Sequence, residues 1–140
     1  MARASNLLVQ REQLKSKYAH MIGMDWGEIK LTTYDEEFLK KATTVITENL
    51  HRFDFNVGAL QEAMSMSRGH LHRKLVALTG YSAGNLIRVL RLKAARSLLR
   101  DEGNSVTEVA MQTGFNNLSY FARAFKQYYG KAPREFRNQL

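Results

Sequence analysis

The sequence predicts an all-α fold, with about seven helices between residue 34 and the C-terminus. Apolar residues recur at spacings of three and four, as on one face of a helix, whereas the period-two alternation of a half-buried strand is almost absent. Only Pro133 could interrupt a helix as a proline does. With 44% hydrophobic and 24% charged residues, the 140-residue chain has the composition of one ordinary globular domain.

Residues 1–34 are expected to form an N-terminal linker or helical arm, followed by a domain over residues 35–138. A helix is expected in the arm from about Asn6 to Ala19, because apolar residues recur there at helical spacing. Glycines and threonines interrupt the pattern that follows. The arm is therefore expected to lie outside the main core.

The first helix of the domain is expected from about Tyr34 to Leu50. Thr33 and Glu36 at its start fit a capping box, in which the threonine hydroxyl accepts a hydrogen bond from a backbone N–H three residues on. Phe38 and Ile46 fall on one face of this helix, so that face should be buried.

A short helix and a longer helix are expected over about residues 56–80. Asn56 precedes the short helix, the segment 65–67 supplies the turn, and Gly80 ends the longer helix near Leu78. Two helices joined by a turn of three or four residues form a helix-turn-helix unit.

The next helix is expected from Ser82 to about Arg100 and has two apolar arcs, with Arg91 between them on one side. Apolar faces on two sides predict a connecting helix with one helical unit packed against each side, which holds them at a fixed separation. A simple bundle helix is the alternative. One arc contains Leu86, Ile87, Leu90, Ala94 and Leu98, and the other contains Leu92, Ala95 and Leu99.

A second helix-turn-helix unit is expected over about residues 105–130. Ser105 and Glu108 fit another capping box, and a turn over 114–116 separates a short helix from one ended by Gly130. A last helical turn is expected over 132–136.

The two units form an internal repeat, offset by about 50 residues in pattern rather than in identity. Because the apolar positions fix the buried face of each longer helix, the opposite face follows at 100° per residue. The expected exposed faces are Gly69, His72, Arg73 and Val76 in the first unit and, at the same offsets, Ser119, Ala122, Arg123 and Lys126 in the second.

The positive charge is concentrated in the middle of the chain. The net charge is +8 and the pI is about 9.9, yet residues 68–100 alone hold eight Lys or Arg and no Asp or Glu. Such a folded basic segment favours a polyanionic partner, although a solvated basic surface is the alternative. With the repeated helix-turn-helix pattern, double-stranded DNA is the expected polyanion.

No constellation of an enzyme is found, so we expect no catalytic residues, metal or cofactor. His70 and His72 point about 200° apart on a helix, unlike zinc ligands four residues apart. Cysteine is absent, which excludes disulfides and thiolate zinc sites. There is no apolar run of membrane-span length and no secretory signal, so we expect a cytoplasmic protein with no membrane contact by this segment.

Residues 114–137, GFNNLSYFARAFKQYYGKAPREFR, resemble the signature of the AraC/XylS family of bacterial transcription regulators. The segment RLKAARSLL at 91–99 is similar to the family's linker helix, and Met66, Ser67, Leu71 and Arg73 are similar to its first recognition helix. The resemblance covers about residues 35–138. It implies two helix-turn-helix units that insert two helices into successive major-groove segments on one side of duplex DNA.

The resemblance also implies positions for base contacts, namely Gly69, His72, Arg73, Leu118, Ser119 and Arg123. Gly69 departs from members with a large side chain there, and Leu118 could offer only an apolar contact. Arg73 and Arg123 are candidates for bidentate hydrogen bonds to guanine, with phosphate contact as the alternative. The phosphate candidates are Arg68, Lys74, Arg88, Arg96, Lys126, Lys131 and the helix N-terminal amides near Asn56 and Ser105.

The arm and the start of the domain, residues 6–41, resemble the linker into the output domain of Bacteroides-type hybrid two-component sensors. This resemblance implies that a receiver domain precedes the segment, with a sensor kinase further upstream, at the cytoplasmic end of a membrane-anchored protein. Because phosphorylated receivers commonly pair, it also implies a homodimer through the parent protein. We expect the domain to act as a transcription activator that contacts RNA polymerase. The alternatives are a stand-alone small AraC-type activator and a basic helical module that binds RNA or an anionic membrane.

Overall fold

The structure, a computed structural model, describes residues 32–138. The helix expected from Asn6 to Ala19 lies outside these residues. Within them the fold is all helical, as predicted, with helices α2 (Thr33–Glu48), α3 (Val57–Met64), α4 (Arg68–Thr79), α5 (Ala83–Leu99), α6 (Val106–Gln112), α7 (Leu118–Tyr129) and α8 (Pro133–Asn138).

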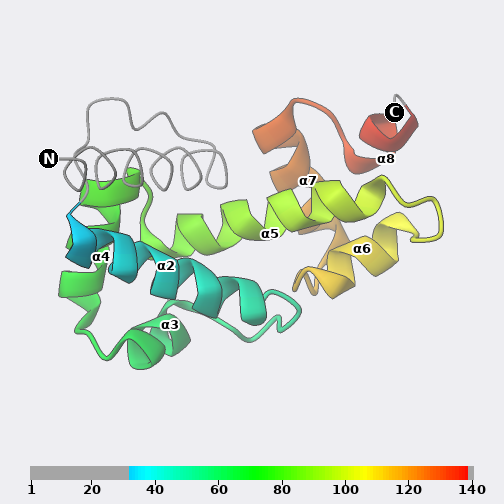
Figure 1. The fold of residues 1–140 in the computed structure, drawn as a ribbon. Coiled ribbons are helices and arrows are strands. Elements are labelled where there is room, and N and C mark those ends of the chain that lie inside the picture. Colours follow the sequence, from blue (N-terminus) through cyan, green and yellow to red (C-terminus); the bar gives the residue numbers. More distant parts are fainter. Residues whose placement is uncertain (1–31, 139–140) are drawn as a thin grey trace, which may run out of the picture.

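Helix α5 runs through the middle of the molecule and separates two groups of helices (Figure 1). Helices α2, α3 and α4 pack with one another and with the first part of α5, and we call them the first subdomain. Helices α6, α7 and α8 pack around the last part of α5 and form the second subdomain. The predicted connecting helix between two helical units is therefore confirmed.

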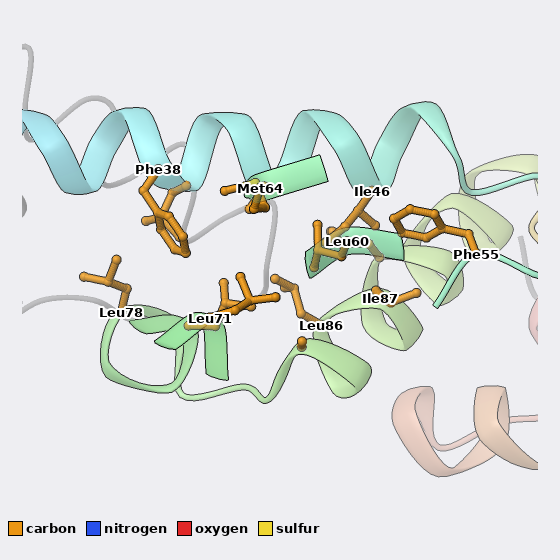
Figure 2. Close-up of a cluster of buried hydrophobic side chains, with 14 residues drawn as sticks. Phe38, Ile46, Phe55, Leu60, Met64, Leu71, Leu78, Leu86 and Ile87 are labelled. Atoms are coloured by element: carbon orange, nitrogen blue, oxygen red, sulfur yellow. The ribbon is translucent and has the colours of Figure 1, made fainter. Parts of the chain in front are cut away.

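The core of the first subdomain is mainly aliphatic. Figure 2 shows side chains from α2, α3, α4 and α5 pointing into one cluster, with Phe38 and Ile46 of α2 facing Leu71 and Leu86. Leu39, Ile46, Leu60, Leu71, Leu75 and Leu86 have no exposed surface. Burial of this apolar surface holds the first subdomain together.

The core of the second subdomain is aromatic. Phe121 and Phe125 of α7 are fully buried, and their ring centroids lie 5.8 Å apart. Phe115 from the turn before α7 and Phe136 from α8 complete the set, at 4.9 Å from Phe121 and 5.7 Å from Phe125. These tilted and edge-on geometries are the ones that aromatic pairs prefer.

The apolar residues of α5 divide along the helix axis rather than only around it. Leu86, Ile87 and Leu90 belong to the first core, whereas Leu92, Ala95 and Leu99 belong to the second. The predicted grouping of Leu98 with Leu86 on one side of the helix is wrong for the packing, because Leu98 packs against the second core. A helix of 17 residues is about 25 Å long, so position along the axis decides which subdomain a side chain reaches.

The helix starts predicted at Asn56, Ser67, Ser82 and Ser105 are confirmed, since each is an N-cap whose side chain accepts a backbone hydrogen bond. The capping box expected at Thr33 is displaced by one residue. Thr32 is the N-cap of α2, and its hydroxyl accepts a hydrogen bond of 3.1 Å from the N–H of Asp35. Adjacent threonines can both supply this cap, and α2 begins with the earlier one.

Candidate nucleic-acid interface

Two helix-turn-helix units lie at opposite ends of α5 (Figure 1). In the first, residues 65–67 join α3 to α4, and Ser65 adopts a left-handed backbone with φ 53°. In the second, residues 113–117 join α6 to α7, and Gly114 is left-handed with φ 85°. Left-handed residues at matching places in the two turns support the repeat found in the sequence.

The second helices of the two units, α4 and α7, are built alike. Each has 12 residues, and each ends at a left-handed glycine, Gly80 or Gly130. Ser67 caps the start of α4 with its hydroxyl, and Asn117 caps the start of α7 with its side-chain oxygen. Each helix therefore begins and ends at a fixed place on its subdomain, as a helix that docks rigidly into a groove requires.

The exposed faces of α4 and α7 agree with the faces predicted from the apolar pattern. Leu71, Leu75 and Leu78 of α4 are buried, and the predicted residues on the opposite face are exposed. On α7 the corresponding residues are exposed too, except for Ala122, which is half-buried. The two exposed faces point away from the cores and are available to a partner.

In the first unit two of the three predicted base-contacting residues border a hollow of about 550 Å³ between α4 and the starts of α3 and α5. Gly69 and His72 line this hollow together with Arg68. The guanidinium of Arg73 extends back over Gly69. Its Nη1 lies 3.1 Å from the position that a Cβ on Gly69 would occupy. The missing side chain of Gly69 therefore gives Arg73 its path along the exposed face.

In the second unit Leu118, Ser119 and Arg123 lie on the exposed surface of α7. Leu118 stands at the first turn of the helix and is 46% exposed. Within the described part of the chain, neither Arg123 nor Arg73 has a hydrogen-bond or ion-pair partner. The structure thus brings one unpaired arginine to the equivalent face of each unit.

The predicted phosphate-contacting residues fall into two groups. Arg68, Arg96, Lys126 and Lys131 are exposed, whereas Lys74 and Arg88 are half-buried. The Lys74 ammonium lies 3.4 Å from Asp35 and 3.7 Å from the centre of the Tyr34 ring, so it contacts α2. The structure therefore does not bring Lys74 together with the exposed cations.

Arg96 and Arg88 also have specific surroundings. The guanidinium of Arg96 lies over the rings of Tyr129 and Phe136, at 5.3 and 5.4 Å from their centres. The Nε of Arg88 is buried without a hydrogen-bond partner among the described residues, at a hollow of about 210 Å³ that Asn116 also lines. The predicted amides near Asn56 and Ser105 lie at the starts of α3 and α6.

A family model described as a helix-turn-helix domain matches residues 60–139, which is more than half of the chain. The match extends from α3 to the end of the described chain and includes both units. The chain belongs to the AraC/XylS family of helix-turn-helix DNA-binding domains. The resemblance identified in the sequence is confirmed, and this is a family of DNA-binding transcription regulators.

Two curated relatives of this AraC/XylS-type domain belong to longer proteins. Histidine kinase P4 of Formosa agariphila is 29% identical over 137 residues, which is 98% of this chain and 10% of the kinase. The transcriptional activator RhaS of Escherichia coli is 36% identical over 84 residues, which is 60% of this chain and 30% of RhaS. The chain therefore spans only a tenth to a third of the length of these relatives.

A solved structure shares the fold of the AraC/XylS-type domain and holds DNA. It is the DNA-binding domain of AdpA, described as a global transcriptional factor in complex with a target DNA. The TM-score is 0.67 and the identity is 28%, with 71% of this chain and 89% of the AdpA domain covered. Across residues 32–138, no helix is long and apolar enough to cross a membrane, and no cluster of His, Asp and Glu could hold a metal ion.

Arg91 is a buried residue of the AraC/XylS-type domain whose contacts could not be predicted from the sequence. Its guanidinium donates hydrogen bonds to backbone carbonyls of both subdomains, at Gly114, Arg52 and Phe55. Burial lowers the pKa of Arg91, and Tyr120 opposes this shift, but an arginine remains charged. The signal in the sequence was an arginine flanked by Leu90 and Leu92, at the boundary between the apolar arcs of α5.

Proposed function

We propose that this domain binds a bipartite duplex DNA site by placing α4 and α7 in successive major-groove segments on one side of the double helix. Two similarly capped helices, each with an exposed and unpaired arginine at the same place in the repeat, are the observation that carries this proposal. Successive major-groove segments on one face are about 34 Å apart. Both helices pack against α5, so α5 would set the distance between them.

The proposed base contacts are made by Gly69, His72 and Arg73 in the first unit and by Leu118, Ser119 and Arg123 in the second. All six are exposed, and all except Leu118 lie on the two predicted faces. Arginine can form two hydrogen bonds to the major-groove edge of guanine, which discriminates against other bases by about 1–3 kcal/mol. The exposed cations Arg68, Arg96, Lys126 and Lys131 would hold the phosphates, as would Arg88, whereas Lys74 would first have to leave Asp35.

Selection of bound sequences from a pool of random duplex DNA tests this function. Two short conserved motifs separated by about one helical turn are expected, each with at least one guanine. Binding of the selected duplex is then compared with binding of an RNA duplex and of anionic vesicles at about 0.15 M salt. Binding to the vesicles or the RNA, with no sequence enriched from the DNA pool, would contradict the proposal.

Two substitutions on the second subdomain separate base contacts from phosphate contacts. Arg123→Ala should relax the base preference at one position of the selected site while leaving the others intact. Arg96→Ala should weaken binding to all sequences alike and reduce the steepness of the salt dependence. An Arg123→Ala protein that selects the same sequence as the wild type would show that Arg123 contacts no base.

The biological role proposed for the domain is that of an activating output module in a two-component signalling protein. The match of nearly the whole chain to a tenth of a histidine kinase supports this context, and the likeness to RhaS supports activation. The parent would act in the cytoplasm as a homodimer and contact RNA polymerase. A receiver domain encoded directly upstream in the native gene is expected, and a promoter carrying the selected site should respond to the parent with increased transcription.

A further inference from the structure

Beside α5 the two subdomains are joined by hydrogen bonds from one side chain to backbone carbonyl oxygens. A second polar contact joins Tyr81, which packs against the first core, to Tyr128, which packs against the second. The apolar cores do not merge there, since Leu90 is the last α5 residue in the first core and Leu92 is the first in the second. Arg91 lies between them. In Figure 1 the loop from α2 to α3 and the turn from α6 to α7 approach each other next to this part of α5.

One guanidinium joins the two subdomains at this place. Nη1 of Arg91 donates to the carbonyl oxygen of Gly114 at 2.9 Å, and Nη2 donates to those of Arg52 at 2.8 Å and Phe55 at 3.0 Å. The N–H donors of a guanidinium are held in one plane, so they reach all three carbonyls only at one arrangement of the two backbones. We call these hydrogen bonds the Arg91 contact.

Gly114 makes the close approach possible. Its φ of 85° is in the left-handed region, and a Cβ on it would overlap the carbonyl oxygen of Leu50 and lie 2.9 Å from Cζ of Arg91. Any other residue would push the α6–α7 turn away from the first subdomain. Gly130 has a similar φ of 81° but no atom within 4 Å of its Cβ position, so its requirement for glycine is local.

The Arg91 contact touches each unit near its recognition helix, which is α4 in the first unit and α7 in the second. Phe55 directly precedes Asn56, the N-cap of α3, which packs against α4. Gly114 lies in the turn that leads to Asn117, the N-cap of α7. A change at this contact would therefore alter the angle between α4 and α7 rather than the fold of either helix.

From this arrangement we infer that Arg91 is a positioning residue, which sets the separation and angle of the two recognition helices and hence the spacing of the two half-sites. The inference rests on the proposed bipartite DNA binding. When one unit has bound DNA, the other is held near its own half-site, which raises the affinity for the whole site. This gain in affinity depends on holding the two units at the right distance. Loss of the Arg91 contact should reduce this advantage without removing any group that touches DNA.

A distance measurement without DNA tests the geometric part. The sequence has no cysteine, so spin labels can be attached at Glu62→Cys on α3 and Gln127→Cys on α7, both of which are exposed. The otherwise unchanged protein should give one narrow distance distribution. Arg91→Met and Gly114→Ala should broaden it, whereas Gly130→Ala, with similar backbone strain, should not.

Arg91→Lys tests whether the Arg91 contact needs the planar donor group or only the positive charge. A lysine keeps the charge, but its single ammonium cannot reach the three carbonyls as a guanidinium does, so the distribution should again broaden. Arg91→Lys is also the mildest of these changes and is expected to stay folded, as judged by helix content and cooperative unfolding. Narrow, wild-type distributions in both Arg91→Lys and Arg91→Met would overturn the inference.

Binding to duplexes of altered spacing tests the functional part. The selected duplex is compared with one carrying a one-base-pair insertion between the half-sites and with one in which a half-site is scrambled. The wild type should bind the inserted duplex more weakly. Arg91→Lys should lose about 10- to 100-fold of affinity for the intact site, bind the single half-site as the wild type does, and distinguish the two spacings less well.

The two measurements distinguish failure of this inference from failure of the proposed function. If Arg91→Lys and the wild type discriminate equally between the two spacings, Arg91 does not position the units and the inference is overturned. If the wild type has no preferred DNA sequence, the proposed function fails, while the label distances still decide whether Arg91 fixes the two subdomains relative to each other.

Discussion

The second helices of the two units, α4 and α7, have the same length and similar caps but contribute different side chains to their cores. Leucines fill the buried positions of α4, whereas two phenylalanines and a tyrosine occupy the equivalent positions of α7. The same backbone arrangement is therefore compatible with an aliphatic core and with an aromatic one. What the two units have in common is the spacing of their apolar residues, and this spacing is sufficient to specify the motif.

The exposed faces of the two units differ as well. In the first unit Arg73 lies over Gly69, which borders a hollow. In the second unit Leu118 and Arg123 stand on the exposed surface of α7. The charges of the two units are similar, since residues 56–80 hold three bases and one acid and residues 105–130 hold two bases and one acid. We therefore expect the two units to prefer different half-sites.

The largest effects should come from truncating the equivalent core residues Leu71 and Phe121, both of which are fully buried. Leu71→Ala should lower the free energy of unfolding by about 2–5 kcal/mol, and Phe121→Ala by about 3–5 kcal/mol. Denaturant unfolding measures the loss, and hydrogen exchange locates it. Because the cores are separate, Leu71→Ala should speed exchange mainly in α3 and α4. Equal acceleration in α7 would show that the two cores behave as one.

Gly69→Ala should have two smaller effects, a gain in stability and a change in base preference. Replacing a helical glycine by alanine should raise the free energy of unfolding by up to about 1 kcal/mol. The new Cβ would lie 3.1 Å from Nη1 of Arg73, so the guanidinium must move and the base preference of the first half-site should change. Thermal unfolding and sequence selection measure the two parts.

Gly84→Ala is the matched control for the Gly69 substitution. Gly84 lines the same hollow from α5, but its Cβ would meet only Val57, at an ordinary 3.8 Å. It should gain similar stability and leave the preferred sequence unchanged. If Gly69→Ala selects the wild-type sequence, the path of Arg73 over Gly69 has no part in recognition.

The smallest effect should appear at alkaline pH and comes from a tyrosine of the second unit that has no ionisable counterpart in the first. Tyr128 takes the place that Leu78 has in the first unit, and burial, followed by the effect of Tyr81 and Tyr129, raises its pKa to about 12. A tyrosine whose pKa is higher in the folded state adds stability below pH 10, and this stability is lost as the pH rises toward 12.

Tyr128→Phe tests this difference, because it keeps the ring and removes the ionisable hydroxyl. The free energy of unfolding of the wild type should fall more steeply between about pH 10 and 12 than that of Tyr128→Phe. Denaturant unfolding at several pH values measures the two slopes. Identical slopes would show that Tyr128 ionises as readily in the folded protein as in the unfolded one.

Most of the fold and much of the candidate interface could be predicted from local signals. Asn56, Ser67, Ser82 and Ser105 act as caps through their own backbone neighbours, so their sequence context is enough to place the helix starts. The exposed faces of α4 and α7 follow from helical periodicity for the same reason. The cap at Thr32 rather than Thr33 shows that such signals locate a helix start but not its exact first residue, because two adjacent threonines are locally equivalent.

By itself, the sequence determined the helices, the repeat, the two exposed faces and the excess of positive charge, because each depends on residues close together in the chain. Only the tertiary structure decided what the individual cations do. Lys74 contacts Asp35 of α2, and Arg91 bonds to carbonyls 23 to 39 residues away. Such contacts depend on which segments fold next to each other, and the same arginine in an exposed helix would be one more surface charge.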